Sequence, residues 1–317
     1  MEQVINGGAR GTQRGWPRVA GLFGVVLATS VFVQPTVLIG VPLVFLLAAR
    51  GFGNVAAAGV AGLLIVIISG GLGGFSDGLW YAERAWAVLL GGWFLTLTLL
   101  LPGWRLTSRA LAASAAAAVV AGAIMVLREG GWSTLDAAIS LSVQAETDAT
   151  LSAISLIGGS DVLSPDVVTL MRDIATTRVM VFPALLGIES LAALAVAWWV
   201  RSRLVGEGDQ GLAPLRDFRF NDHLVWVLVA GILLLVLQSG EAFARVGSNA
   251  VVFMGALYAL RGLAVYFFVS GGLSVIGYAV FAVLLVLVPP VILGTAALIG
   301  IGDTWLDLRA RSAQKAI

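Results

Sequence analysis

Residues 179–200 read VMVFPALLGIESLAALAVAWWV, and this stretch decides the fold class of the chain. It contains one charged side chain, Glu189, and lies between Arg178 and Arg201. An α-helix rises about 1.5 Å per residue, so a helix over this stretch is long enough to cross the ~30 Å hydrocarbon core of a bilayer. The stretch therefore predicts a transmembrane helix.

Similar apolar runs occur along most of the chain. Together with the first they form the following candidate spans: 17–33, 35–50, 53–71, 79–101, 108–127, 179–200, 222–239, 248–269 and 274–302. The second run is short, and the last contains Pro289-Pro290, where a kink is expected. We therefore predict an all-α polytopic membrane protein with eight or nine transmembrane helices, forming a single transmembrane domain over residues 1–317.

The composition agrees with this fold class. Of the residues, 59% are hydrophobic and only 12% are charged, and the mean hydropathy is +0.97. Soluble globular proteins contain about 25% charged residues, so the composition favours the lipid bilayer as the medium and partner of the chain. The net charge is +1 and no block of basic residues occurs, so nucleic acid is not an expected partner.

The loop charges predict an orientation with the N-terminus in the cytoplasm, because basic residues are retained on that side. Ten arginines precede the first span or lie in the predicted cytoplasmic loops: Arg10, Arg14, Arg18, Arg50, Arg105, Arg109, Arg201, Arg203, Arg216 and Arg219. The predicted outer loops contain fewer: Arg128, Arg172, Arg178 and Arg245. One conflict remains, since nine spans would put the basic tail with Arg309, Arg311 and Lys315 outside.

The longest connection between spans is the outer segment 128–178. Leu135, Ile139 and Val143 follow one another at helical spacing. Ser164 followed by Pro165 is typical of a helix N-terminus. We therefore predict a helical extracytoplasmic segment at 132–177, which is either a packed cap or a mobile lid over a site.

Two ionisable residues are expected near the centre of the bilayer. Burying a charge there costs free energy, so each residue is expected to have a partner or a function. Glu189 lies in the span 179–200 and Arg261 in the span 248–269, at similar predicted depths. We predict that they form an intramembrane polar pair. The pair is either a structural ion pair that fixes helix register or part of a substrate or proton site.

A second group of polar residues is predicted at the outer rim of the spans. It consists of Glu83, Arg84, Glu241, Arg245 and Asn249. The i, i+4 spacing of the acid and the arginine in the last three allows an ion pair on one helical turn. The group is either a solvated rim or an outward-facing pocket for a polar solute.

The chain lacks the residues of common catalytic and cofactor sites. It contains no cysteine and one histidine, His223, so a thiolate or histidine metal site is not expected. No His-Glu-x-x-His motif and no aspartate cluster occurs. The only lysine is Lys315, so no phosphate-binding loop is present. We expect no cofactor, no metal and no enzymatic activity.

Several motifs resemble one family. They are Pro35 to Pro42 with Arg50-Gly51, Ser164-Pro165-Asp166 with Phe182-Pro183, Asn249 to Tyr258-Ala-Leu-Arg261-Gly262, and Gly300-Ile-Gly-Asp303-Thr-Trp305-Leu-Asp307-Leu-Arg309. In this order they resemble the YybS-like predicted membrane proteins of bacteria, a domain of unknown function, over nearly the whole chain. The resemblance implies glutamine where this chain has Arg261, which argues against a general role for that charge.

The resemblance implies a protein class and no activity. The helical organisation of the family is distantly similar to that of the substrate-binding subunits of energy-coupling-factor transporters, and to the MreD-type cell-shape protein. The first hypothesis is therefore a bacterial inner-membrane protein that binds a small solute, as a transport-associated subunit with another membrane protein as its partner. The alternative is a scaffolding subunit of the cell envelope without a ligand.

Overall fold

All regular structure in the described residues is helical. The computed structural model describes residues 16–31, 33–49, 78–158, 164–205, 212–237, 240–272 and 274–315. Within these ranges it contains α-helices and two short 3₁₀ helices and no strand. The all-α prediction is confirmed for this part of the chain, whereas the predicted span 53–71 lies outside the described residues.

Four of these helices are long and apolar enough to cross a membrane: α6 (Leu106–Leu127), α9 (Phe182–Leu204), α11 (Glu241–Val269) and α13 (Pro289–Leu306). The shorter helices α2 (Trp16–Thr29), α3 (Pro35–Ala48) and α10 (Val225–Val236) are also apolar. On α6, large apolar side chains such as Val126 and Leu127 are exposed, at 74% and 86%. Lipid is the medium that accepts such a surface. The total of eight or nine spans stays a prediction.

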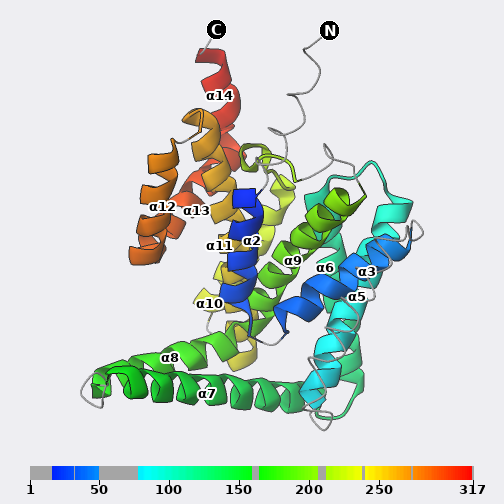
Figure 1. The fold of residues 1–317 in the computed structure, drawn as a ribbon, viewed down its shortest axis with the longest axis vertical. Helices are drawn as coiled ribbons and strands as arrows, with labels where there is room; N and C mark the ends of the chain where they lie inside the picture. Colours follow the sequence, from blue (N-terminus) through cyan, green and yellow to red (C-terminus); the bar gives the residue numbers. More distant parts are fainter. Residues whose placement is uncertain are drawn as a thin grey trace, which may run out of the picture. The chain divides into compact units, whose positions relative to one another are not determined.

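The chain divides into two compact units, Met1–Leu212 and Ala213–Ile317, and each is described by itself. The single domain predicted over 1–317 stays a prediction. In the first unit α9 is the central helix and packs against α2, α3 and α6 (Figure 1). The helix α5 (Gly78–Leu100) packs against α3 and α6.

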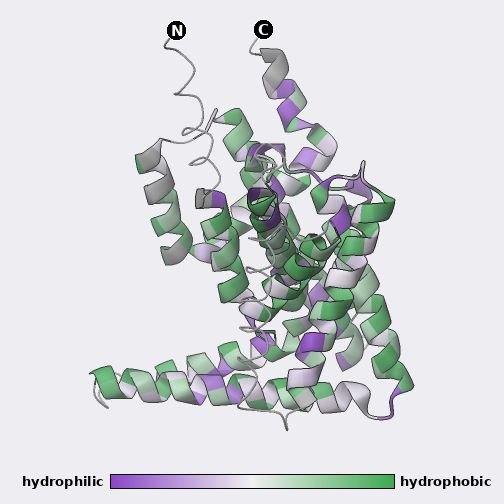
Figure 2. Ribbon diagram, turned by 45° about the vertical axis from the view of Figure 1, so that its right-hand side comes forward, coloured by the Kyte–Doolittle hydropathy of each residue, from purple (hydrophilic) through white to green (hydrophobic). Residues whose placement is uncertain are grey.

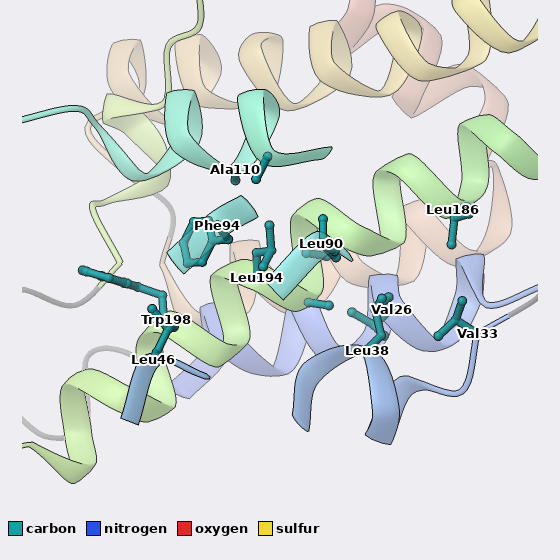
Figure 3. Packing of buried hydrophobic residues seen from close by; sticks show 13 residues of the cluster. Val26, Val33, Leu38, Leu46, Leu90, Phe94, Ala110, Leu186, Leu194 and Trp198 are labelled. Carbon is teal, nitrogen blue, oxygen red and sulfur yellow. The ribbon is translucent and has the colours of Figure 1, made fainter. Parts of the chain in front are cut away.

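The apolar core of the first unit follows α9 from one end to the other. Val33 and Leu186 lie at one end of this cluster, and Phe94 and Trp198 lie at the other (Figure 3). The cluster is built mainly from Val, Leu, Ala and Phe side chains that are less than a tenth exposed. This packing holds the two ends of α9 against different helices, and a polar site lies at each end.

The predicted outer segment folds as a helical hairpin of α7 (Gly131–Gly158) and α8 (Pro165–Met180). The Ser164 hydroxyl caps α8 by accepting a hydrogen bond from the Val167 amide, and Pro165 is the first helical residue, as predicted. The hairpin lies across one end of the other helices of the first unit (Figure 1). Ile139 and Val143 are buried against Val31 and Phe182 at the predicted spacing. Hydrophilic turns alternate with hydrophobic turns along the hairpin (Figure 2).

In the second unit α11 is the central helix and packs against α10 and α13. Small residues bring these backbones together, as is common between membrane helices. A Cβ atom at Gly262 would lie 1.7 Å from the carbonyl oxygen of Ala296, and one at Gly300 would lie 2.1 Å from that of Tyr258. Only glycine allows α11 and α13 to approach this closely.

The predicted span 274–302 is two helices and not one kinked helix. The first, α12, is Val275–Leu287, and α13 begins at Pro289. Val288 between them has φ −135° and ψ 55°, outside the helical region, because a proline that follows disfavours helical geometry in the preceding residue. The chain turns back at this break (Figure 1).

The basic C-terminal tail is held against the second unit by specific contacts. In α14 (Leu308–Lys315) the Arg309 guanidinium donates to the carbonyl oxygens of Arg216 and Phe218, at 3.1 and 3.0 Å. Asp307 pairs with Arg219 at 3.3 Å. The tail therefore lies at the same end of the second unit as the basic segment that precedes α10. A return of the chain at the break between α12 and α13 predicts a cytoplasmic tail, in agreement with the positive-inside rule, and the side of the tail stays a prediction.

Candidate functional site

Glu189 is the most deeply buried acid of the first unit. It lies in the second turn of α9, is 0% exposed, and neither carboxylate oxygen has a hydrogen-bond partner among the described residues. The groups that act on it are the Glu83 carboxylate and the Ser30 hydroxyl, which lies near Glu189 but donates its proton to the Val33 carbonyl oxygen at 3.0 Å. Buried polar groups are nearly always paired, so an unpaired carboxylate beside a second acid is a candidate for a functional site.

Glu83 lies in the first turns of α5 and is 5% exposed. It accepts a hydrogen bond from the Gln34 backbone amide and pairs with Arg84 at 3.3 Å. The Arg84 guanidinium lies over the Trp80 ring, 3.8 Å from its centroid. Arg84 therefore pairs with Glu83, whereas Glu189 has no basic partner among the described residues.

The break between α2 and α3 supplies the backbone of this site. Residues 30, 31, 33 and 34 are not helical, because Pro35 begins a new helix and lacks the amide that would continue the previous one. The break frees the Gln34 amide for Glu83 and the Ser30 carbonyl for Arg178, whose guanidinium donates to it at 2.8 Å. Arg178 also pairs with Glu146 of α7 at 3.5 Å. The α7–α8 hairpin is thus tied to the helix break.

Trp86 of α5 contacts α9 next to Glu189. Its indole nitrogen donates to the Ser190 hydroxyl at 3.1 Å, which joins α5 to α9 one residue after Glu189. The site consists of Glu189, Glu83, Ser30 and the Gln34 amide. It has two buried carboxylates and a broken helix, an arrangement suited to a proton or to a small cationic group. Within the described residues no group of three or more acids and histidines is placed to hold a metal ion.

Arg261 lies in a different polar cluster, in the second unit. Its guanidinium donates to Asp303 at 3.0 Å and to Asp222, and Asp303 also pairs with Arg309 at 3.5 Å. The Arg261 and Asp303 side chains are 4% and 0% exposed, whereas Asp222 is 61% exposed. Burial lowers the pKa of the Arg309 guanidinium below its ordinary value, although the Asp303 charge opposes that shift. This cluster fastens the tail to α11.

The predicted pair of Glu189 and Arg261 joins residues of two units and stays a prediction. Within its own unit Arg261 already has two carboxylate partners, so the arginine does not need Glu189 to satisfy its charge. The structural alternative, in which a buried ion pair holds helices in register, applies to Arg261 and Asp303. Glu189 belongs to the first unit with Glu83.

The predicted outer-rim group is also divided between the units. Glu83 and Arg84 form an ion pair in the first unit. In the second, Glu241 is exposed in the first turn of α11, and the Asn249 side chain donates to the Arg245 carbonyl at 2.8 Å. A common pocket of the five residues stays a prediction.

Sequence reasoning missed several members of these clusters. Ser30 and Gln34 are polar residues that separate two short apolar runs before a proline. This pattern indicates a helix break, but it does not indicate that the break lies beside Glu189. Asp303 directly follows the predicted span 274–302, and the predicted boundary therefore places it outside the span. In the structure it lies within the apolar helix α13, where the cost of burying a charge applies to it as well. Asp222 lies too close to a loop to be singled out.

Comparisons with known proteins place this chain in a predicted membrane protein family of unknown function. The family model described as "Predicted membrane protein (DUF2232)" matches residues 20–304. No curated protein and no solved structure matches the chain. The predicted resemblance to a bacterial membrane protein family of unknown function is confirmed, and the distant similarity to energy-coupling-factor subunits stays a prediction.

Proposed function

This chain belongs to the DUF2232 family of predicted membrane proteins. We propose that it is a solute-binding protein of the bacterial inner membrane. Glu189 and Glu83 bind a small solute through a cationic group. The observation that carries the proposal is the fully buried carboxylate of Glu189, whose two oxygens have no hydrogen-bond partner among the described residues. The N-terminus lies in the cytoplasm.

The position of the carboxylates supports a solute in preference to a purely structural role. A structural acid in a membrane is normally satisfied by a cation or by hydrogen-bond donors. Arg84 and the Gln34 amide satisfy Glu83 in this way, and no hydrogen bond satisfies Glu189 within the described residues. A bound ammonium group would supply the missing charge and the missing donors together.

The neighbouring helix break supports the same proposal. Non-helical backbone inside a membrane is tolerated where protein covers it or where it lines a cavity. Substrate sites of transporters are typically formed by interrupted helices. Since the chain has no nucleotide-binding motif, movement of the solute would draw its energy from a partner subunit or an ion gradient.

The test compares small molecules that copurify with the full chain and with Glu189→Gln. Both proteins are purified in detergent with native lipids, denatured, and the released small molecules are identified by mass spectrometry. We expect a cationic compound with the wild-type protein and at least about tenfold less with the variant, since the loss of one charged hydrogen bond in a buried site is worth about that factor. Asp148→Asn, at an exposed acid of α7, is the matched control and keeps the compound.

Equal amounts of every compound in the wild-type protein and Glu189→Gln would reject the proposal, provided that both melt at similar temperatures. Copurification of envelope proteins alone, without a small cationic molecule, would instead support the scaffolding alternative.

A further inference from the structure

A second polar site lies at the other end of the core of the first unit, around Trp198. The Arg109 guanidinium carbon lies 4.8 Å from the Trp198 ring centroid, and that of Arg201 lies 4.6 Å from the same centroid. Arg109 is 7% and Arg201 4% exposed. Two buried arginines therefore share one indole ring, at the end of the core opposite Leu186 and Val33 (Figure 3).

Arg201 has a structural reason to lie there, and Arg109 does not. Arg201 occupies the last turn of α9, where the partial negative charge of a helix C-terminus favours a cation. Arg109 occupies the first turn of α6, where the helix dipole has the opposite sign and disfavours a cation. Arg201 adds repulsion, because it is close enough to interact electrostatically with Arg109.

The hydrogen bonds of Arg109 are also incomplete. Its buried Nε has no acceptor, and no carboxylate pairs with it among the residues that the structure describes. A buried donor without an acceptor is costly, and a buried charge without a counter-charge more so. Burial, repulsion and the helix dipole therefore act against Arg109 together, and one bound anion would offset all of them.

The start of α6 offers further donors to an anion. Arg105 is its N-cap residue and provides no side-chain cap, and the first turn contains no acidic residue. The first backbone amides of a helix lack acceptors within it and attract phosphate groups. Arginine forks bind phosphate oxygens in pairs. Amides, Arg109 and Arg201 together match a phosphate group better than a carboxylate, which has fewer oxygens to share among them.

We propose that Arg109, Arg201 and the first turn of α6 bind the phosphate group of a ligand beside Trp198. Basic residues and tryptophan at span ends are typical of the cytoplasmic headgroup layer, and basic pockets between helices on this side bind anionic lipid headgroups. The phosphate belongs either to such a lipid or to a soluble phosphate compound from the cytoplasm. This site is separate from the carboxylates of Glu189 and Glu83 and does not depend on their function.

The test uses the full chain in detergent with three probes: phosphatidylglycerol, inorganic phosphate and diacylglycerol, which lacks phosphate. Native mass spectrometry measures bound lipid, and the melting temperature reports stabilisation by each probe. We expect phosphatidylglycerol to bind and stabilise the wild-type protein and diacylglycerol to do neither. Arg109→Gln lowers the affinity for phosphatidylglycerol by about tenfold, the usual effect of removing one charged partner.

Arg105→Gln is the matched control, since Arg105 is an exposed arginine one helical turn earlier. It keeps the wild-type affinity within about twofold, because exposed charges contribute little. Stabilisation by inorganic phosphate as well, lost in Arg109→Gln, identifies a soluble phosphate compound as the ligand. Stabilisation by phosphatidylglycerol alone identifies a lipid.

Two results would overturn the site. One is equal binding of phosphatidylglycerol to wild type, Arg109→Gln and Arg105→Gln, which means general lipid contact. The other is a fall in the melting temperature of Arg109→Gln in the absence of any probe, together with unchanged lipid binding. That result would give Arg109 a structural role, whereas the proposed site requires that the variant without probe be at least as stable as wild type.

Discussion

Arg261 and Asp303 illustrate why a buried charge must be interpreted through its partners. Both side chains are almost fully buried, and they pair with one another at 3.0 Å. Mid-span position predicted that Arg261 needs an acid. It did not identify Asp303, which is 42 residues further along the chain, because sequence separation says nothing about which helix faces meet.

The first prediction concerns this pair. Arg261→Ala leaves Asp303 buried with less counter-charge, so we expect a loss of about 3–5 kcal/mol in the free energy of unfolding. Asp222→Asn removes the exposed partner of the same arginine, and we expect a loss of at most ~1 kcal/mol. Chemical denaturation of both variants in detergent micelles measures the difference.

The double variant Arg261→Leu with Asp303→Leu separates pairing from general damage. Because both members of the pair are removed together, and Arg309 keeps the carbonyl oxygens of Arg216 and Phe218 as acceptors, it should recover part of the stability that Arg261→Ala loses. Equal losses in Arg261→Ala and Asp222→Asn would contradict the assigned roles of the two acids.

At the scale of helices, some features could be predicted from neighbouring residues in the sequence, whereas others depend on contacts between helices. The Ser164 cap and the apolar face of α7 follow from nearest neighbours in sequence, so they were predictable. The division of the span 274–302 into α12 and α13 was only partly so. Pro289-Pro290 predicts a break or kink in the helix. Whether the helix bends or turns back depends on the packing available to its second half, here the close approach of Gly300 to Gly262 of α11.

The second prediction tests the close contact of α11 with α13. Gly262→Ala would place a Cβ 1.7 Å from the Ala296 carbonyl oxygen, so the helices must separate, and overpacking of this kind costs about 1–3 kcal/mol. Gly255→Ala on the same helix meets nothing within 4 Å. It should leave the melting temperature unchanged or raise it, because alanine favours helix by up to ~1 kcal/mol. A melting temperature of Gly262→Ala at or above that of Gly255→Ala would refute the contact.

At the scale of the whole molecule, charge is sorted along each unit. In the first unit the helix end with Arg109 and Arg201 lies opposite the acidic end with Glu83 and Glu189, and α9 connects the two. In the second unit the basic segment before α10 and the basic tail lie at one end. The positive-inside rule predicts a cytoplasmic position for each of these basic ends.

The third prediction tests this topology in intact cells. The chain has no cysteine, so single cysteines can be labelled with a membrane-impermeant maleimide without background. Arg216→Cys and Arg311→Cys replace exposed residues at the same end of the second unit, and both should be labelled only after the membrane is opened. Asp148→Cys on α7 should be labelled from outside. Labelling of Arg216→Cys and Arg311→Cys from opposite sides would disprove the return of the chain at Pro289.

Hydropathy and helical spacing along the chain were enough to predict the membrane, the all-α fold class and most helix positions. These depend on hydrophobicity, helical period and capping, which act within a few residues or along one helix. The tertiary structure alone decided which charges meet: Glu83 beside Glu189, Asp303 with Arg261, and Arg109 with Arg201 around Trp198. The physical reason is that partners of a buried charge are chosen by the packing of distant helices, and many packings are compatible with one pattern of apolar runs.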